Sequence, residues 1–388
     1  MANPEAGTIR CPMPGPLPGD LDLDDPRPVH WMTLSNGVGA WVVSDYRLGR
    51  EVLADRRFTR SEAVRSDVPK LTTVDPAPDS IISLDGPAHA RLRRIVAGAF
   101  TERRIADLQP EIERIAGELL DAMTAEVAPV DFVSAFASPL PLHVLCRMLG
   151  IPLTDYAQFQ TWVPVLFDLA GDGADSRTSA FRITHYMTKL VGLKRREPAD
   201  DLLTALVQAT DEGGRLTNRE LVTLALSLLM AGYDSTGDQI ALSILSLLQD
   251  KPRMQALRER PGTIPAEVEE LLRTNPSAPA SFTRMTRETV NLRNVVIEPG
   301  QPVVVFLMAA NRGVSEGETS SGGPMPHLTF GHGIHRCLGA PLARLQLATA
   351  LRLVSERLPT LALAEDPDRL LWKTGSATRG LTRMNVTW

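Results

Sequence analysis

The segment Phe330-Gly331-His332-Gly333-Ile334-His335-Arg336-Cys337-Leu338-Gly339 places a cysteine directly after a glycine-rich turn. Glycines allow backbone conformations and close approaches that other residues resist. The apolar periodicity that follows predicts a helix from about Leu338 to Leu358, which puts Cys337 at a helix N-terminus. The N–H groups and the partial positive charge at such an end favour a thiolate over a thiol. We therefore expect the Cys337 sulfur to be an anionic ligand or a nucleophile.

Other roles for this cysteine are open at this point. A buried cysteine that packs as a small apolar side chain is common for this residue type. A hydrolase nucleophile paired with His335 or His332 is a further alternative, but no orienting acid is evident. The remaining cysteines, Cys11 and Cys146, are too few and too distant for a disulfide framework or a four-cysteine zinc site. This cysteine usage fits a reducing cytoplasm.

The wider string, F-G-x-G-x-H-x-C-x-G followed by Ala340-Pro341-Leu342-Ala343-Arg344, resembles the haem-binding signature of the cytochrome P450 family. The resemblance implies that the Cys337 thiolate is the axial ligand of haem b (iron protoporphyrin IX) and pushes electron density toward bound oxygen. It also implies cofactor contacts for Phe330, Gly331, His335 and Gly339. Further motifs in the family's order extend the resemblance from about residue 85 to the end of the chain.

Composition sets broad limits on function. The chain has 388 residues, 43% of them hydrophobic, which is enough to bury a large core and a sizeable cofactor. Its net charge of −5 gives no global electrostatic attraction to nucleic acid or to an anionic membrane. The N-terminus lacks the pattern of a signal peptide, and no apolar run of about 18 residues indicates a membrane span. These observations predict a soluble protein of the cytoplasm, and the resemblance implies a bacterial enzyme.

Hydrophobic periodicity predicts a mainly α fold with small β-sheets (α+β). The resemblance implies a single cytochrome P450 domain over 1–388, with an extended arm at 1–28 and an atypical Gly/Ser-rich loop at 313–326. It also implies a haem buried between the long central helix and the cysteine-loop helix. The predicted helices are 88–99, 104–126, 139–149, 154–170, 178–194, 200–210, 218–249 and 265–275, and the predicted strands are 39–44, 288–297 and 302–308.

The longest predicted helix, 218–249, starts with a capping box, Thr217-Asn218-Arg219-Glu220, and Lys251-Pro252 is expected to stop it. Its centre, Met230 to Thr236, contains Gly, Asp, Ser and Thr, which are poor residues for a buried helix. A polar patch facing a crevice is one explanation. The resemblance implies instead an oxygen-binding kink in which Asp234 relays protons with Ser235 or Thr236. The family usually has Thr directly after the acid, whereas this chain has Ser235.

Several basic residues match family positions that contact the haem propionates. His89 and Arg93 lie four residues apart on one helix face and could hold an anion together, although a solvated basic face is the ordinary explanation. The resemblance implies that His89, Arg93, Arg284 and His335 bind the propionates. Buried carboxylates need such partners because an unpaired buried charge is costly.

Glu270 and Arg273 stand three residues apart on one helix, which by itself indicates only a surface ion pair. Their position resembles the family's E-x-x-R motif, to which we assign a structural role. The family commonly has an acidic, Pro- and Phe-rich segment with an arginine that joins this pair. Residues 313–326 contain neither Phe nor Arg, so we expect Arg273 to use backbone carbonyls instead.

The resemblance implies that the enzyme activates O2 and oxidises a moderately large, mostly apolar small molecule, by default through hydroxylation, in bacterial secondary metabolism. Oxidative C–C or C–N coupling of aromatic or cyclic-peptide substrates is an alternative, and a haem-thiolate sensor without turnover is another. The substrate-lining residues implied by the resemblance are Ala231, Tyr233, Ala280, Ser281, Phe282, Ser376 and Ala377.

Electrons must come from a partner, because the sequence shows no flavin or nicotinamide site and no cysteine set for an iron–sulfur cluster. The resemblance implies a ferredoxin that is reduced by a ferredoxin reductase. Basic side chains could form the docking face for such an acidic partner. The candidates are Arg103, Arg104, Arg336 and Arg344.

Overall fold

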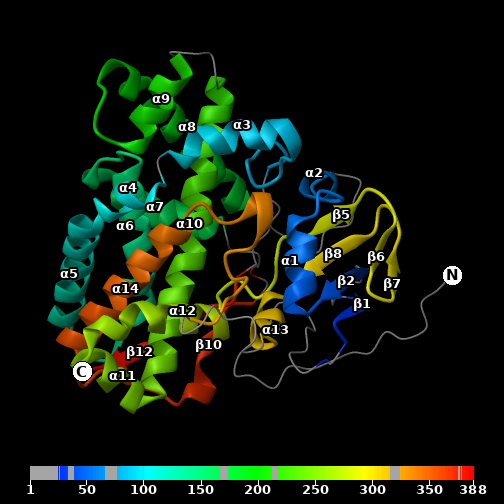
Figure 1. Cartoon of the computed structure of the whole chain (residues 1–388). Helices are drawn as coiled ribbons and strands as arrows, with labels where there is room; N and C mark the ends of the chain where they lie inside the picture. The colour runs from blue at the N-terminus through cyan, green and yellow to red at the C-terminus, as the bar shows by residue number, and fades with distance from the viewer. Residues whose placement is uncertain are drawn as a thin grey trace. The chain divides into compact units, whose positions relative to one another are not determined.

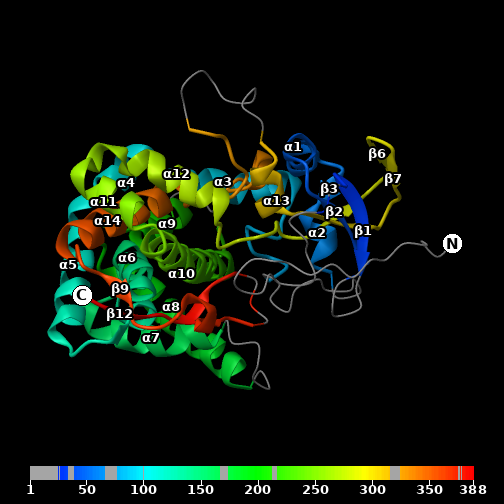
Figure 2. The same ribbon diagram turned by 90° about the horizontal axis from the view of Figure 1, so that it is seen from below.

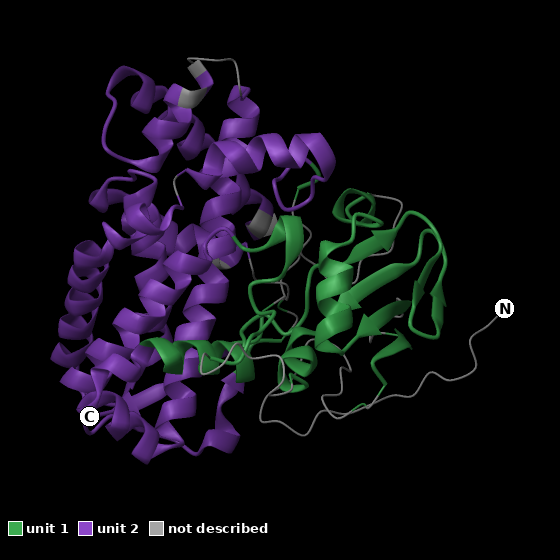
Figure 3. Cartoon of the chain, in the orientation of Figure 1, with its two compact units in different colours: residues 1–78, 265–337, 372–380 green, residues 79–264, 338–371, 381–388 purple. Residues whose placement is uncertain are grey.

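The structure is a computed structural model that describes residues 25, 27–33, 39–65, 77–98, 100–166, 174–211, 216–314, 324–374, 376 and 378–388. The chain divides into two compact units (Figure 3). Unit 1 contains residues 1–78, 265–337 and 372–380, and unit 2 contains 79–264, 338–371 and 381–388. Most of the predicted arm at 1–28 and of the loop at 313–326 falls outside the described residues. The single domain over 1–388 stays a prediction.

Unit 1 is built on a five-stranded sheet with the order β1-β2-β8-β5-β3. Strands β2 and β8 pair in parallel, and the other neighbouring strands pair antiparallel. Helix α1 (Tyr46–Ala54) packs its apolar face on this sheet, where Val52 and Leu53 join Val303 and Val305 in one buried cluster (Figure 1). The strands are β1 (Val29–Thr33), β2 (Gly39–Val43), β8 (Pro302–Val305), β5 (Arg284–Thr286) and β3 (Phe58–Thr59).

The rest of unit 1 consists of short elements around this sheet. One prediction is wrong here, because 302–308 is not all strand: β8 ends at Val305, and a short helix follows from Leu307. The apolar run hides this change, since buried strands and buried helix turns have the same composition. The elements are α2 (Arg60–Ala63), α12 (Ile264–Thr274, from Pro265 on), the hairpin β6 (Val290–Leu292) and β7 (Val295–Ile297), and α13 (Leu307–Arg312).

Unit 2 is helical, with a small three-stranded sheet of order β4-β12-β9. Its main helices are α3 (Gly86–Ala97), α4 (Glu102–Ala106), α5 (Gln109–Ala125), α6 (Pro139–Met148), α7 (Tyr156–Val165), α8 (Ala174–Arg196), α9 (Leu202–Asp211), α10 (Asn218–Leu248), α11 (Lys251–Glu259) and α14 (Ala340–Arg357). A π-helical turn, η1 (Val133–Ala137), precedes α6. The small sheet contains β4 (Val130–Asp131), β12 (Asn385–Thr387) and β9 (Ala362–Leu363).

Helix α10 is the central helix of unit 2. Figure 2 shows it nearly end-on, and α6, α8 and α14 pack against it. The predicted capping box is present, since Thr217 accepts from the Glu220 N–H and Glu220 accepts from the Thr217 N–H. Within the described residues, no helix has the length and apolar character needed to cross a membrane.

Prolines explain two differences from the predicted helices. The segment 104–126 is two helices rather than one, because Pro110 lies in the first turn of α5. Lys251-Pro252 does not simply stop α10 but begins α11, where the Asp250 side chain accepts from the Arg253 N–H. Proline is favoured in a first helical turn, since the N–H that it lacks has no partner there. The prediction of a mainly α fold with small sheets is confirmed.

Candidate functional site

Cys337 lies in a tight loop of unit 1 and is exposed. Its N–H donates to the Phe330 carbonyl at 2.8 Å, and the Gly331 N–H donates to the Leu328 carbonyl at 2.7 Å. Gly333 has a φ of 71°, and a Cβ there would lie 2.6 Å from the Leu53 carbonyl oxygen. A side chain at this position would therefore meet both strain and a clash. The loop is closed by its own backbone and presents the sulfur at its end.

The helix after the loop starts later than the sequence predicts. Helix α14 begins at Ala340 with Gly339 as its N-cap, so Cys337 precedes the helix rather than starting it. Pro341 in the first turn accounts for this start. Of the cysteines in the described part of the chain, Cys146 is fully buried, and burial raises the pKa of its thiol. Cys337 is the accessible one and is the better candidate for a ligand.

Two basic side chains of unit 1, Arg284 on the sheet and His335 in the cysteine loop, are suited to carboxylates. Arg284 on β5 is only 4% exposed, and its Nη1 donates to the Phe58 carbonyl at 3.2 Å. His335 is half-buried in the single 3₁₀ turn Gly333–His335. A guanidinium kept in the interior of a protein favours an anionic partner, because burial makes an isolated charge costly.

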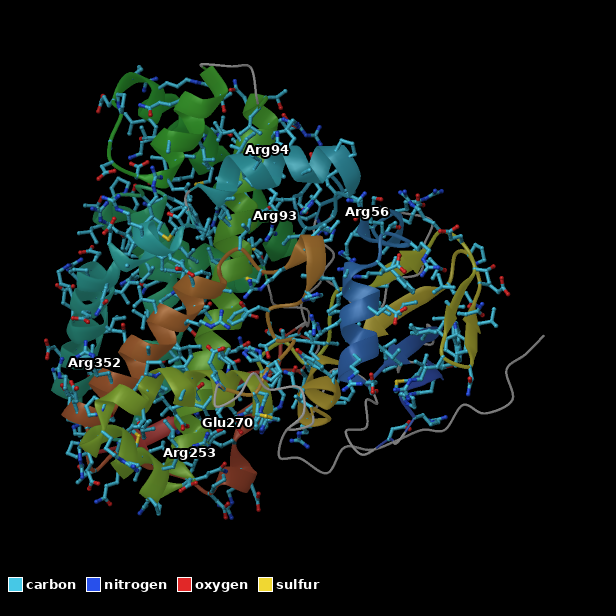
Figure 4. All side chains as sticks on the ribbon, in the orientation of Figure 1. Arg56, Arg93, Arg94, Arg253, Glu270 and Arg352 are labelled. Atoms are coloured by element: carbon cyan, nitrogen blue, oxygen red, sulfur yellow. The ribbon has the colours of Figure 1, made fainter. Side chains whose placement is uncertain are left out.

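The Glu270–Arg273 pair on α12 is bidentate. Arg273 Nε lies 2.8 Å from Glu270 Oε2, and Nη2 lies 2.7 Å from Oε1. The hydrogen bond to Glu270 raises the pKa of Arg273. Arg273 Nη1 donates to the Asn311 carbonyl at 3.0 Å, so it uses a backbone carbonyl. Figure 4 labels Glu270 on α12.

The sequence prediction missed Asn311, which is fully buried at the end of α13. The signal that could have found it is a lone amide directly after the apolar run Val303 to Ala310. Such a residue needs internal hydrogen-bond partners when it is buried. Thr329, next to the cysteine loop, was missed as well.

The polar centre of α10 lies in unit 2 and is continuous α-helix. Asp234 and Thr236 are buried, whereas Ser235 is half-buried and donates from Oγ to the Ala231 carbonyl at 2.9 Å. The helix is not interrupted at the predicted kink, and the Ser235 bond is of a kind that Ser227 and Ser246 also make on α10. Thr223, Ser227, Ala231 and Ser235 form an accessible stripe spaced by four residues, and every residue from 236 to 245 is buried. Ser235 therefore ends the accessible stripe.

Helix α3 carries the other predicted propionate ligands. His89 is 3% exposed and Arg93 is half-buried, and Figure 4 labels Arg93 and the exposed Arg94 on this helix. Arg91 forms an ion pair with Glu220 at the start of α10. The basic segment thus contains one ion-paired residue, Arg91, a buried His89 and a half-buried Arg93.

The predicted substrate-lining residues are divided between the units. In unit 1, Ser281 exchanges hydrogen bonds with Val305, and Phe282 is 47% exposed with the Arg60 guanidinium over its ring. In unit 2, Ala231 is exposed and Tyr233 is buried on α10. Ala377 lies outside the described residues.

The predicted site residues as a whole are divided between the two units. Unit 1 holds Glu270, Arg273, Ala280, Ser281, Phe282, Arg284, Phe330, Gly331, His335, Arg336, Cys337 and Ser376. Unit 2 holds His89, Arg93, Arg103, Arg104, Ala231, Tyr233, Asp234, Ser235, Thr236, Gly339 and Arg344.

Comparison with known sequences identifies relatives along nearly the whole chain. A family model described as Cytochrome P450 matches residues 173–358. The mycinamicin IV hydroxylase/epoxidase of Micromonospora griseorubida is 40% identical over 95% of this chain and 94% of that protein. The cytochrome P450 monooxygenase PikC of Streptomyces venezuelae is 36% identical over 96% of this chain and 91% of that protein.

Solved cytochrome P450 structures have a similar backbone fold. The structure of the mixed-function P450 MycG matches with a TM-score of 0.87 and 36% identity, over 98% of this chain and 100% of that chain. A putative thioether synthase, SgvP, involved in the tailoring step of griseoviridin, matches with a TM-score of 0.86 and 36% identity, over 94% of each chain.

Proposed function

Since the chain belongs to the cytochrome P450 family, and is an enzyme of that family's monooxygenase or oxidase type, we propose that it oxidises a moderately large, mostly apolar small molecule in bacterial secondary metabolism. The observation that carries this proposal is the exposed Cys337 in its glycine-bounded loop. Relatives named as a mycinamicin IV hydroxylase/epoxidase and a nocardicin C N-oxygenase support the oxidation of a small molecule in secondary metabolism.

The described residues fit a haem-thiolate cofactor, which we take to be haem b. The exposed Cys337 would supply the sulfur ligand, and Arg284, His335, His89 and Arg93 would supply basic side chains for two propionates. When bound, the haem supplies the chemistry of O2 activation, and the protein supplies binding, orientation and electrostatics. Phe330, Gly331 and Gly339 would form the backbone surface around the sulfur.

We assign proton delivery to Asp234 and Ser235. Ser235 Oγ stands at the end of the accessible stripe of α10 and can both donate and accept a proton. Asp234, one residue earlier and buried, is a carboxyl that can supply that hydroxyl through a short relay. Thr236 is buried, so we give the hydroxyl role to Ser235.

Hydroxylation is the proposed reaction. Ala231, Ala280 and the half-exposed Phe282 would offer small and apolar contacts, with Tyr233, Ser281, Ser376 and Ala377 completing the proposed lining. A product that contains one oxygen atom from isotopically labelled O2 would support hydroxylation.

Oxidative coupling is a second candidate, favoured by Ser235 in place of the usual threonine. The similarity to the putative thioether synthase SgvP supports it as well. Coupling removes hydrogen from the substrate without adding oxygen, so the mass of the product separates the two reactions.

The proposed electron donor is a ferredoxin with its reductase. Arg103, Arg104 and Arg336 are exposed and Arg344 is half-buried, and positive charge at the surface would attract an acidic partner. We place the enzyme in the cytoplasm, where a free thiol such as Cys146 stays reduced.

The test of the proposed function is the absorption spectrum of the dithionite-reduced protein with carbon monoxide. We expect a strongly red-shifted Soret band that is absent in Cys337→Ala and kept in Cys146→Ala, the matched loss of a thiol. Haem without this band in the wild type would mean a different or protonated ligand. A wild-type protein that binds no haem would overturn the proposal.

A further inference from the structure

Asn311 is fully buried, and both polar atoms of its side chain form hydrogen bonds. Its Oδ1 accepts from the Leu328 N–H at 2.6 Å. Its Nδ2 donates to the Arg273 carbonyl at 3.2 Å and to Thr329 Oγ1 at 2.9 Å. A buried amide with every group satisfied fixes its neighbours relative to one another, because any shift leaves a buried polar group without its bond.

Thr329 extends this connection back to α12. Its Oγ1 donates to the Leu272 carbonyl at 2.6 Å while accepting from Asn311. The hydroxyl therefore uses its one proton in a fixed direction. Nearby, the His327 ring lies 3.2 Å from Glu269 Oε2 and receives the Thr329 N–H at 3.3 Å. Residues 327–329 are thus held on α12 by side-chain and backbone bonds together.

The cysteine loop starts directly after Thr329. Phe330, the next residue, accepts the Cys337 N–H at 2.8 Å, and Leu328 accepts the Gly331 N–H at 2.7 Å. One peptide unit therefore separates the Thr329 hydroxyl from the carbonyl that holds the Cys337 backbone. These contacts all lie within unit 1.

We propose that Asn311 and Thr329 are positioning residues that orient the Cys337 sulfur by tying its loop to α12. Arg273 makes its third hydrogen bond to the Asn311 carbonyl, and the Asn311 side chain in turn donates to Thr329. The inference rests on the proposed function, because the orientation of the sulfur matters for a thiolate ligand.

The experiment compares Thr329→Val with Thr329→Ser in the holoenzyme. Valine keeps the shape but removes the hydroxyl, which leaves the Asn311 amide and the Leu272 carbonyl each short of one bond, whereas serine keeps it. We expect the ratio of red-shifted to normal Soret band in the reduced carbon monoxide complex to fall about tenfold in the valine variant, as for loss of a buried hydrogen bond. Thr329→Ser should keep the wild-type ratio of the two Soret bands.

Thr210→Val is the matched control, because Thr210 is also buried and donates to a backbone carbonyl, Leu206, at 2.8 Å. It should lower stability without changing the ratio of the two bands. A valine variant at 329 with the wild-type ratio, or a control with the same loss as that variant, would overturn the positioning role. Absence of the red-shifted band in the wild type would instead reject the proposed function.

Amide hydrogen exchange in the wild-type holoenzyme tests the same idea if Thr329→Val does not fold. The Leu328 N–H is held by Asn311 and the Cys337 N–H by Phe330. We expect both amides to exchange with the same opening free energy, since one connection holds both. Rapid exchange at Cys337 while Leu328 stays protected would show that the network does not hold the cysteine.

Discussion

Arg91 on α3 forms an ion pair with Glu220 in the first turn of α10. Glu220 also closes the capping box with Thr217, so one carboxylate both caps the central helix of unit 2 and attaches α3 to it. Helix α3 carries His89 and Arg93, two of the proposed propionate ligands. The stability of this helix pair is therefore linked to the cofactor site that we propose.

Glu220→Gln should lower the free energy of unfolding by about 1 kcal/mol near neutral pH, because it removes a negative charge at a helix N-terminus and the ion pair with Arg91. The Thr217 N–H, and then Arg91, lower the pKa of Glu220 below its ordinary 4.5. Its contribution is thus present above pH 4.5 and is lost as the pH falls through the lowered pKa. Chemical denaturation at several pH values should show the two proteins converging in acid.

Glu118→Gln is the control for this prediction, because Glu118 pairs with Arg114 on α5 but is 63% exposed. An exposed pair of this kind is worth less than about 1 kcal/mol. An equal loss in both variants would contradict the special role of Glu220.

Gly333→Ala should destabilise the protein by about 3 kcal/mol. Its φ of 71° strains any side chain, and the new Cβ would lie 2.6 Å from the Leu53 carbonyl oxygen and 2.8 Å from the Ala54 Cα. Gly98→Ala is the opposite case, since Gly98 has a φ of −60° and open space around its Cα. Thermal unfolding should show a gain of about 0.5 kcal/mol for Gly98→Ala. If the two variants changed stability equally, the proposed strain and clash at Gly333 would be refuted.

The helices could be predicted where the local signals agreed. For α10, a capping box, a long apolar pattern and a nearby proline all favour one helix, and its observed bounds differ from the prediction by one residue at the C-terminal end. The start of α11 could not be predicted in this way, because Pro252 is compatible both with a helix stop and with a first helical turn.

In the candidate site, too, only the features with a local sequence signal could be predicted. The loop around Cys337 is visible in the sequence because glycines, histidine and cysteine stand close together. Asn311 and Thr329 are 18 residues apart and meet through a tertiary hydrogen bond, which leaves no periodic trace in the sequence. Ser235 is half-buried whereas Thr236 is buried, and this difference depends on which helices pack against α10. Helix propensity alone does not predict that packing.

Arg284→Gln should weaken haem retention, because a buried guanidinium on β5 would no longer pair with a propionate. Arg287→Gln is the matched control, since Arg287 is 54% exposed and approaches Glu62 at 3.8 Å. Transfer of haem to apomyoglobin should be about tenfold faster in the first variant and unchanged in the second. Unchanged transfer from Arg284→Gln would remove this arginine from the proposed cofactor site.

Ser235→Ala should reduce the product formed per electron consumed by about tenfold or more, because a positioned proton donor is lost while electron delivery continues. Thr236→Val removes the neighbouring hydroxyl from a buried position and should change this ratio much less. The ratio can be measured with a surrogate ferredoxin once a substrate is found by its spin-state shift. If Thr236→Val has the larger effect, the relay runs on the buried side of α10 instead. Ser235→Thr should keep most of the coupling, since it preserves a hydroxyl on the accessible stripe that ends at this residue.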